Sequence, residues 1–283
     1  MANMVHQTHD VAEAYARDGF AFPLDILSPA KAGELRADLE AGETELADDP
    51  RRLTLLRAYP AQLLPSFDAL VRHPAMIAAA AAVLGPDLMV WGSGLFIKEA
   101  NTPSYVSWHQ DLTYWGLDDM QEATLWVALS PATVDSGCMR FVPGTHRRQI
   151  VPHVDSFAEH NLLTRGQELA VDVAEEQAVD IVLRSGQASL HHGHLFHASG
   201  PNRTDDRRIG AAIRYIAPSM KLKSGDRALV ALVLGEDRHG NFKLAPPPRG
   251  RLADEDFALC LEDAAIKNRV LFDGAEQQGR RRA

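Results

Sequence analysis

The stretch SWHQDLTYWG, residues 107–116, places His109 and Asp111 two positions apart in a run of aromatic and β-branched residues. Such a run favours a β-strand, in which alternate side chains share a face. His109 and Asp111 would then be neighbours on one surface, about 7 Å apart along the backbone. The pair could bind one metal ion, or it could be two polar residues that happen to fall on one face of a strand. A third ligand would decide between these interpretations.

A second stretch, SLHHGHLFHASGPNRTDDRRIGAAIRY at residues 189–215, contains histidines that could supply this ligand. On one straight strand His191 and His197 would share a face but lie about 20 Å apart, too far to bind the same ion. Alternation alone does not choose between them. His192 and His194 would point the other way, and a cluster of this kind can also be a hydrated or pH-sensitive patch.

The residues that follow the last of these histidines predict a turn and a returning strand. Residues 200–206 are rich in Gly, Pro, Asn and Asp, which favour turns. We expect the chain to return as an antiparallel strand, 208–216, that brings Arg208 beside His197 and Ser199. A buried arginine needs an anionic partner, and small residues on its face of the strand would leave room for a ligand. An exposed arginine on an edge strand is the alternative.

The rest of the chain predicts a β-core flanked by helices. Short runs of β-forming residues, separated by Pro, Gly, Asn and Asp, follow one another from position 87 and suggest an antiparallel sandwich or barrel. Helices are predicted at 10–17, 29–46, 74–84 and 254–267. We expect one domain, 1–283, made of a mostly helical flank (1–86), a jelly-roll core (87–218) and a C-terminal extension of strand and helix (219–283).

Composition excludes several classes of protein. The chain has 283 residues, of which 46% are hydrophobic, and its net charge of −9 argues against binding to nucleic acid or to anionic membranes. Cys138 and Cys260 lack zinc-site spacing, and two cysteines make no disulfide scaffold. The longest apolar run, 76–84, is too short to cross a bilayer, and the N-terminus has no signal-peptide pattern. We expect a cytoplasmic protein, with the basic run 280–282 as a solvated tail.

Three blocks, taken in order, resemble a known family. They are His109-Gln110-Asp111, GCMRFVPGTHR (137–147) and HASGPNRTDDRR (197–208), and they are similar to the phytanoyl-CoA dioxygenase family of iron(II)- and 2-oxoglutarate-dependent oxygenases. The segment YARDGFAFPLDILSPAKAGELRADLE (15–40) resembles the opening of that family, so the resemblance covers nearly the whole chain. It implies a mainly β (α+β) fold, a double-stranded β-helix (cupin-like jelly roll) with N-terminal and C-terminal flanking helices.

The resemblance also implies the site. His109, Asp111 and His197 match the two-histidine, one-carboxylate group that binds and activates iron, which leaves open positions for other ligands. Arg208 matches the arginine that holds the distal carboxylate of 2-oxoglutarate, and Ser199 matches a hydroxyl that assists it. The implied cofactors are Fe(2+), 2-oxoglutarate and O2. The remaining histidines, His191, His192 and His194, become neighbours of the site and not ligands.

The implied activity is hydroxylation of an unactivated carbon of a small molecule, with release of succinate and CO2. Halogenases that resemble this family replace the carboxylate by Ala or Gly, so Asp111 favours hydroxylation. One alternative keeps the same iron site for desaturation, epoxidation or ring closure in natural-product biosynthesis. A second is a cupin-like, non-oxidative metal-binding protein, against which Arg208 argues, because such a protein has no need to hold a cosubstrate carboxylate.

The substrate pocket is less well defined by the sequence. Lys98, Tyr105, Trp126 and Arg140 are its predicted lining, although a surface lysine, packed aromatic rings and a surface arginine are the plainer alternatives. Further arginines, among them Arg214, could pair with an anion on the substrate. They favour an anionic or zwitterionic small molecule. The oligomeric state has no signature in the sequence.

Overall fold

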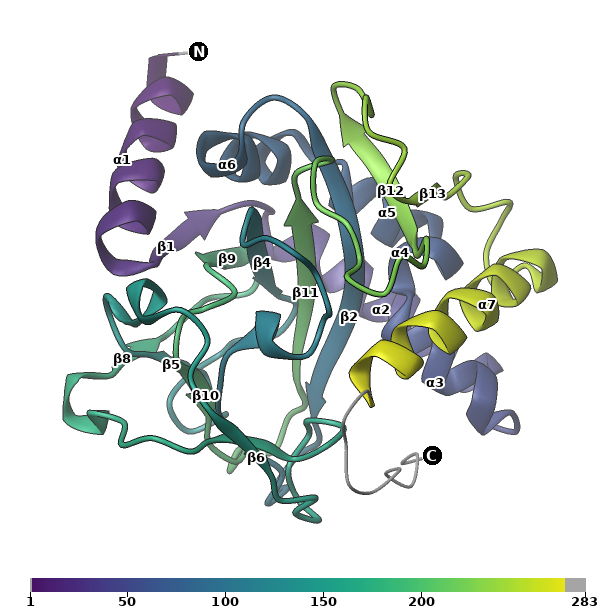
Figure 1. The fold of residues 1–283 in the computed structure, drawn as a ribbon. Coiled ribbons are helices and arrows are strands. Elements are labelled where there is room, and N and C mark those ends of the chain that lie inside the picture. Colours follow the sequence, from purple (N-terminus) through teal and green to yellow (C-terminus); the bar gives the residue numbers. More distant parts are fainter. Residues whose placement is uncertain (1, 273–283) are drawn as a thin grey trace.

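The computed structural model describes residues 2–272 and contains two facing β-sheets (Figure 1). Within these residues the larger sheet has the strand order β1 (Phe20–Asp25), β9 (Gln187–His191), β4 (Glu122–Ala128), β11 (Arg208–Ile216), β2 (Leu88–Lys98), β12 (Leu229–Leu234) and β13 (Lys243–Leu244). The smaller sheet has the order β3 (Val106–His109), β10 (His197–Ser199), β5 (Met139–Phe141) and β8 (Val179–Ile181). A separate pair joins β6 (His153–Asp155) and β7 (Gln167–Leu169). This arrangement confirms the predicted mainly β fold.

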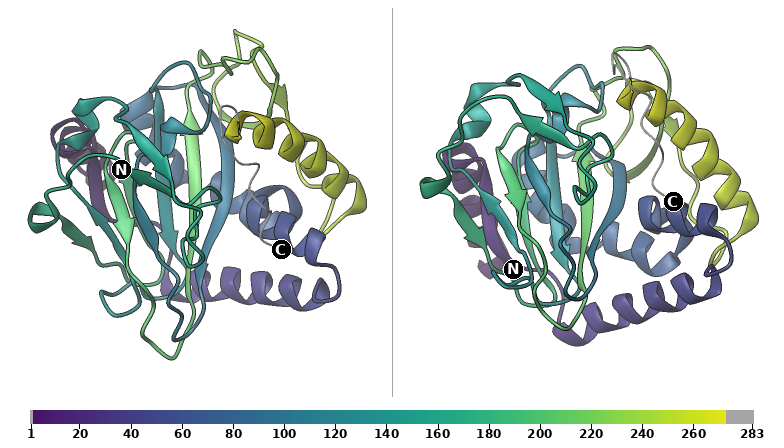
Figure 2. Two further views of the ribbon diagram at one scale, coloured as in Figure 1. Left: turned by 60° about the horizontal axis from the view of Figure 1, so that its bottom comes forward. Right: turned by 90° about the horizontal axis from the view of Figure 1, so that it is seen from below.

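Helices cover the outer face of the larger sheet, and the smaller sheet lies across its inner face (Figures 1 and 2). The helices are α1 (Ala2–Asp18), α2 (Pro29–Glu45), α3 (Pro50–Ala58), α4 (Pro60–Leu63), α5 (Pro65–Val71), α6 (Pro74–Leu84) and α7 (Asp254–Leu271). Local sequence sets several helix ends. Ser28 caps α2 by accepting a hydrogen bond from the Lys31 amide, and Gly85, with φ 92°, ends α6. The helices predicted at 29–46 and 74–84 are confirmed.

Alternation along β11 divides the two layers of the core. Ile209, Ala211, Ile213 and Tyr215 are fully buried against the helices. The residues between them, from Arg208 to Arg214, face inward, toward the smaller sheet. The predicted alternation is therefore confirmed, and it delivers two arginines to the interior of the jelly roll.

The strand predicted around the first motif is shorter than expected. β3 ends at His109, and Asp111 begins a short 3-10 helix, Asp111–Thr113. Gln110 explains the break, because its side chain donates to the carbonyls of Gln149 and His194 at 2.6 and 2.8 Å. It also accepts a hydrogen bond from the amide of Val151. The carboxylate is thus placed by a turn and not by alternation along a strand.

The second motif also departs from the prediction. The chain leaves the larger sheet after His191 and enters the smaller one at His197, so residues 187–198 are not one strand. The intervening turn brings the rings of His191 and His197 to a centroid distance of 4.9 Å, and the predicted separation of about 20 Å on a straight strand does not apply. Nor do β10 and β11 form a hairpin. They lie in different sheets and face each other, and Arg208 pairs with Lys98 of β2.

The larger sheet extends beyond the range 87–218, because β1 joins one edge and β12 and β13 join the other. Helix α7 runs four residues past the predicted end at position 267. No single described helix is long and apolar enough to cross a membrane; α5 and α6 together meet the length and composition criteria, with a bend of 41° between them. The basic run 280–282 lies outside the described residues.

Candidate active site

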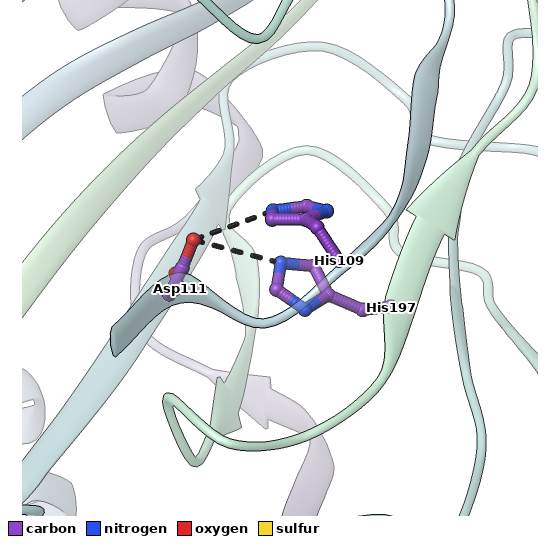
Figure 3. A group of neighbouring side chains, drawn as sticks. All are labelled: His109, Asp111 and His197. Atoms are coloured by element: carbon purple, nitrogen blue, oxygen red, sulfur yellow. Dashed lines mark ion pairs between the residues drawn. The ribbon is translucent and has the colours of Figure 1, made fainter. Parts of the chain in front are cut away.

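Three side chains predicted as metal ligands converge inside the jelly roll. Oδ1 of Asp111 lies 3.3 Å from Nε2 of His109 and 3.9 Å from Nε2 of His197. One ligand atom from each residue falls within 4.8 Å of the others, and Figure 3 shows the carboxylate facing both rings. Ligand atoms bound at right angles to one ion lie about 3 Å apart, so this spacing suits a single metal.

Backbone carbonyls orient both imidazoles. Nδ1 of His109 lies 2.9 Å from the carbonyl oxygen of Ser107, and Nδ1 of His197 lies 2.9 Å from that of Leu195. Each ring therefore donates its Nδ1–H to the residue two positions earlier, which leaves the Nε2 lone pair free and turned toward Asp111. Such orientation of a free lone pair is what a metal site requires.

The protonation states also fit a metal. Burial alone would raise the pKa of Asp111, but the imidazoles of His109, His191 and His197 around its carboxylate hold that pKa well below its usual value. Burial lowers the pKa of His197 well below its usual value, with a further contribution from His109. An ionised carboxylate and a neutral imidazole are the forms that bind metal ions.

His191 lies beside the three converging residues. The residue is 2% exposed, and Nε2 of its ring is 3.9 Å from Oδ2 of Asp111. Neither ring nitrogen has a hydrogen-bond partner within the described residues. The placement agrees with the expectation that this histidine is a neighbour of the ligands.

Two buried cations lie at the other end of the same interior. Lys98 is fully buried and donates to Oγ of Ser199 at 2.7 Å, to the carbonyl of Gly137 at 3.3 Å, and to the carbonyl of Gly200. Arg208, 2% exposed, lies directly opposite Lys98 in the pairing of β11 with β2. No acidic side chain within residues 2–272 forms an ion pair with either residue, and Nε of Arg208 lacks a partner.

This pair of buried basic residues lacks a counterion within the described part of the chain. Burial, followed by the charge of Arg208, lowers the pKa of Lys98 to about 6. Burial also lowers the pKa of Arg208 to about 10. Buried charges without a counterion are strongly unfavourable, so the site fits a bound carboxylate that would neutralise them. The distal carboxylate of 2-oxoglutarate matches this requirement.

Trp126 occupies space that the sequence suggested was free for a ligand. A Cβ on Gly210 would lie 1.7 Å from Cζ2 of Trp126, so the absent side chain makes room for the indole ring. The ring in turn lies 5.2 Å from the guanidinium carbon of Arg208. Gly210 therefore makes room for a packed aromatic ring that covers Arg208. The prediction that this small residue leaves space for a ligand is wrong at position 210.

Two cavities meet at the converging ligands. The inner cavity is lined by His197, Ser199, Arg208, Trp126 and their neighbours. The outer cavity is lined by Tyr59, Trp91, Tyr114, Trp115, Lys267 and their neighbours. Four residues line both: Phe96, His109, Asp111 and Arg214. The ligand group thus lies where the inner cavity meets the outer one.

Of the residues predicted to line the substrate pocket, some lie at the cavities and others do not. Trp126 lines the inner cavity, and Lys98 lies behind Ser199. Arg140 forms ion pairs with Glu175 and Asp180 and does not line either cavity, and Tyr105 also lies outside their linings. The sequence analysis missed the contributions of Phe96 and Trp91, which lie on β2; the glycines beside them at positions 92 and 94 are the signal that could have indicated a cavity.

Two histidines and one carboxylate at the boundary of a jelly-roll cavity, with buried cations behind them, define a mononuclear non-haem iron oxygenase. Residues 15–210 match the model of the phytanoyl-CoA dioxygenase (PhyH) family, and the chain belongs to that family. It is therefore a 2-oxoglutarate-dependent dioxygenase that uses iron(II), 2-oxoglutarate and O2, as the resemblance implied.

Individual relatives agree. The chain is 29% identical over 213 residues to an ectoine dioxygenase of Nocardia farcinica (strain IFM 10152), an alignment covering 67% of this chain and 71% of that protein. Among solved structures it resembles the non-heme monooxygenase ThoJ, with 34% identity, a TM-score of 0.85 and coverage of 93% and 98% of the two chains. The epimerase SnoN, at 22% identity and a TM-score of 0.60 over 77% of this chain and 86% of its own, shares the fold.

Proposed function

We propose that this enzyme hydroxylates an unactivated carbon of a small molecule, with His109, Asp111 and His197 holding iron(II) and Arg208 holding 2-oxoglutarate. One observation carries the proposal. A single cavity contains three convergent ligand atoms at one end and an unpaired, buried guanidinium at the other. A metal ion and a dicarboxylate together satisfy both ends, and neither does so alone.

The residues of the chain divide the work. His109, Asp111 and His197 would hold the metal and would leave further coordination positions open for the cosubstrate and O2. The planar fork of Arg208 can grip a carboxylate in a bidentate pair, and Lys98 adds a second positive charge beside Ser199. Trp126 covers the guanidinium and excludes water from it. These contacts fix the cosubstrate in one pose.

When bound, iron(II) with 2-oxoglutarate and O2 supplies the oxidising chemistry, in which one oxygen atom enters the substrate C–H bond and the other enters succinate as CO2 leaves. Asp111 would supply the carboxylate ligand that halogenases resembling this family replace with Ala or Gly. Hydroxylation is accordingly the outcome that the donor set favours.

A different outcome at the same site is the second candidate. Solved structures that share the fold include proteins named as an epimerase and a carbocyclase, so the jelly roll accommodates more than one oxidative result. Desaturation, epoxidation or ring closure would each use the same ligands. Membership of the dioxygenase family argues against the non-oxidative metal-binding alternative.

The test is succinate formation. Purified enzyme reconstituted with iron(II) should convert 2-oxoglutarate to succinate only when oxygen is present, and a panel of small molecules should stimulate the rate. Product mass then separates the outcomes, because hydroxylation adds one oxygen atom and desaturation removes two hydrogens. Failure to consume 2-oxoglutarate under all of these conditions would overturn the proposal.

Two further predictions belong with this proposal. We propose that residues 1–283 act as one dioxygenase domain, because β1 and β12, from opposite ends of the chain, belong to the same sheet. A cytoplasmic location also stays a prediction. Cys138 and Cys260 are both buried and free, as a reducing compartment would leave them.

A further inference from the structure

Arg214 lies on the inward face of β11, six residues after Arg208, and lines both cavities. We propose that Arg214 binds a carboxylate of the primary substrate, and that the substrate is a carboxylic acid with an apolar or aromatic body. This inference rests on the proposed function and assigns the substrate class of the same site.

The first support is an unpaired charge. Among the buried guanidinium nitrogens of residues 2–272, those without a hydrogen-bond partner are Nε of Arg208 and Nε of Arg214. Arg208 is accounted for by 2-oxoglutarate. Arg214 is half-buried and forms no ion pair with a described acidic side chain, so this guanidinium has no assigned anion although its Nε is withdrawn from water.

The second support is the way in which the guanidinium is held. Its central carbon lies 5.1 Å from the ring centroid of Trp115 and 5.9 Å from that of Phe96. A Cβ on Gly94 of the neighbouring strand β2 would lie 3.4 Å from Nη1, in ordinary van der Waals contact, so β2 packs closely beside the guanidinium. Aromatic rings position a guanidinium by its face and leave its N–H edges free for a bidentate acceptor.

The surrounding charges favour a single negative charge on the ligand. Lys267, which also lines the outer cavity, is already paired with Asp263 at 2.8 Å. Asp111 is a proposed metal ligand. Glu122 accepts a hydrogen bond from Thr124 at 2.6 Å and forms no ion pair with Arg214, and burial raises the pKa of its carboxyl group well above the usual value. One unpaired positive charge therefore remains, and it suits a carboxylate better than a doubly charged phosphate.

The residues that line the outer cavity indicate the chemical character of the rest of the substrate. Tyr59, Trp91, Tyr114 and Trp115 contribute aromatic surface, and Leu162 lies among them. Aromatic walls bind apolar or planar groups. Because Arg214, His109 and Asp111 line the same cavity, an acid anchored at this arginine would keep its body between the aromatic wall and the proposed metal site.

The experiment measures binding to anaerobic enzyme loaded with iron(II) and 2-oxoglutarate, followed by the visible charge-transfer band of that complex. The probes are 3-phenylpropionate, indole-3-acetate and decanoate, each compared with its primary amide. We expect at least one acid to bind 10-fold or more tightly than its amide. Arg214→Gln should remove this preference, and Arg214→Lys, which keeps the charge but loses the fork, should retain part of it.

The control is Arg238→Gln, which removes an exposed arginine paired with Asp87 and Glu236, and it should leave the preference unchanged. The absence of any acid preference in the wild type, or its persistence in Arg214→Gln, would overturn the inference. The affinity for 2-oxoglutarate distinguishes a failure of this inference from a failure of the proposed function. That affinity should stay within 2-fold of wild type in Arg214→Gln. If the variant lost affinity for 2-oxoglutarate, Arg214 would be assigned to the cosubstrate and not to the substrate. A wild type that forms no charge-transfer band with 2-oxoglutarate overturns the proposed function and this inference with it.

Discussion

Arg208 of β11 and Lys98 of β2 are direct partners in an antiparallel strand pair, and both are buried. Burial makes both cations costly to charge, and their mutual repulsion adds to this cost. Of the two residues, the lysine is the one that loses its proton near neutral pH, because its pKa is lowered to about 6. The enzyme without cosubstrate therefore holds Lys98 mostly neutral at pH 7.5.

Binding of 2-oxoglutarate should take up a proton at pH 7.5. The incoming carboxylate favours the charged lysine and raises its pKa again, so the complex binds close to one proton more than its components. Anaerobic calorimetry of the metal-loaded enzyme in phosphate and in Tris should show binding enthalpies that differ by the ionisation enthalpy of the buffers. Lys98→Met should abolish the difference. Equal enthalpies in both buffers with the wild type would contradict the account.

The same residue should affect stability. Between about pH 6 and 10.5 the unfolded chain binds a proton at Lys98 that the folded chain does not, so this group makes the free energy of unfolding rise with pH. Lys98→Met should therefore flatten the dependence of the melting temperature on pH in the absence of 2-oxoglutarate. Exposed Lys31, which pairs with Glu34, provides a matched control in Lys31→Met. A wild-type slope retained in Lys98→Met would show that the lysine is charged in the folded state.

Removal of Arg208 should weaken the binding of 2-oxoglutarate much more than the binding of the metal. A bidentate charged pair lost from a buried site costs about 3 kcal/mol, so Arg208→Ala should raise the KM for 2-oxoglutarate by roughly 100-fold. Metal affinity, measured by equilibrium dialysis, should change by less than about 3-fold, since the ligands are untouched. An unchanged KM would move the carboxylate contact to another arginine.

Loss of a predicted ligand should give the opposite pattern. His197→Ala removes one of the three donors and should lower iron(II) affinity by roughly 100-fold or more, with turnover lost in parallel. His160→Ala, at an exposed histidine, is the matched control and should bind iron as the wild type does. Full turnover in His197→Ala would show that the ligand assignment is wrong.

Gly210→Ala tests the packing behind the arginine. The new methyl group would overlap the Trp126 ring, which contacts Arg208, and overpacking of this kind costs about 1–3 kcal/mol. We expect the melting temperature to fall by several degrees and the affinity for 2-oxoglutarate to fall with it. Gly33→Ala is the control, because Gly33 lies on an exposed face of α2 with nothing near its Cβ position. There the substitution should be neutral or stabilising.

The sequence predicted those features that depend on local pattern. Ser28 with its following proline gave the start of α2, and the alternation from Ile209 to Tyr215 gave the two faces of β11. The family motifs named the residues that converge at the site. The first two depend on a few neighbouring positions and are confirmed as structural features. The three motif residues converge in the structure, and their role as metal ligands stays a prediction.

The features that the sequence did not predict depend on distant contacts. The strand break after His109 is fixed by Gln110 bonding to segments about 40 and 84 residues away. The turn after His191 carries the chain between sheets, and periodicity within either strand does not report it. The unpaired state of Arg214 was also invisible, because it depends on which acids fail to reach it.

Helix α7 closes the outer cavity from one side with Lys267, Asn268 and Leu271, and Tyr59 contributes from the junction of α3 and α4. None of these residues belongs to the group proposed to hold iron or 2-oxoglutarate, and α7 lies outside residues 15–210, which the family model matches. The residues of this cavity wall can therefore change in evolution while the residues proposed to hold iron and 2-oxoglutarate stay the same. Exchanging the last helix between relatives should transfer molecular preference without rebuilding the catalyst.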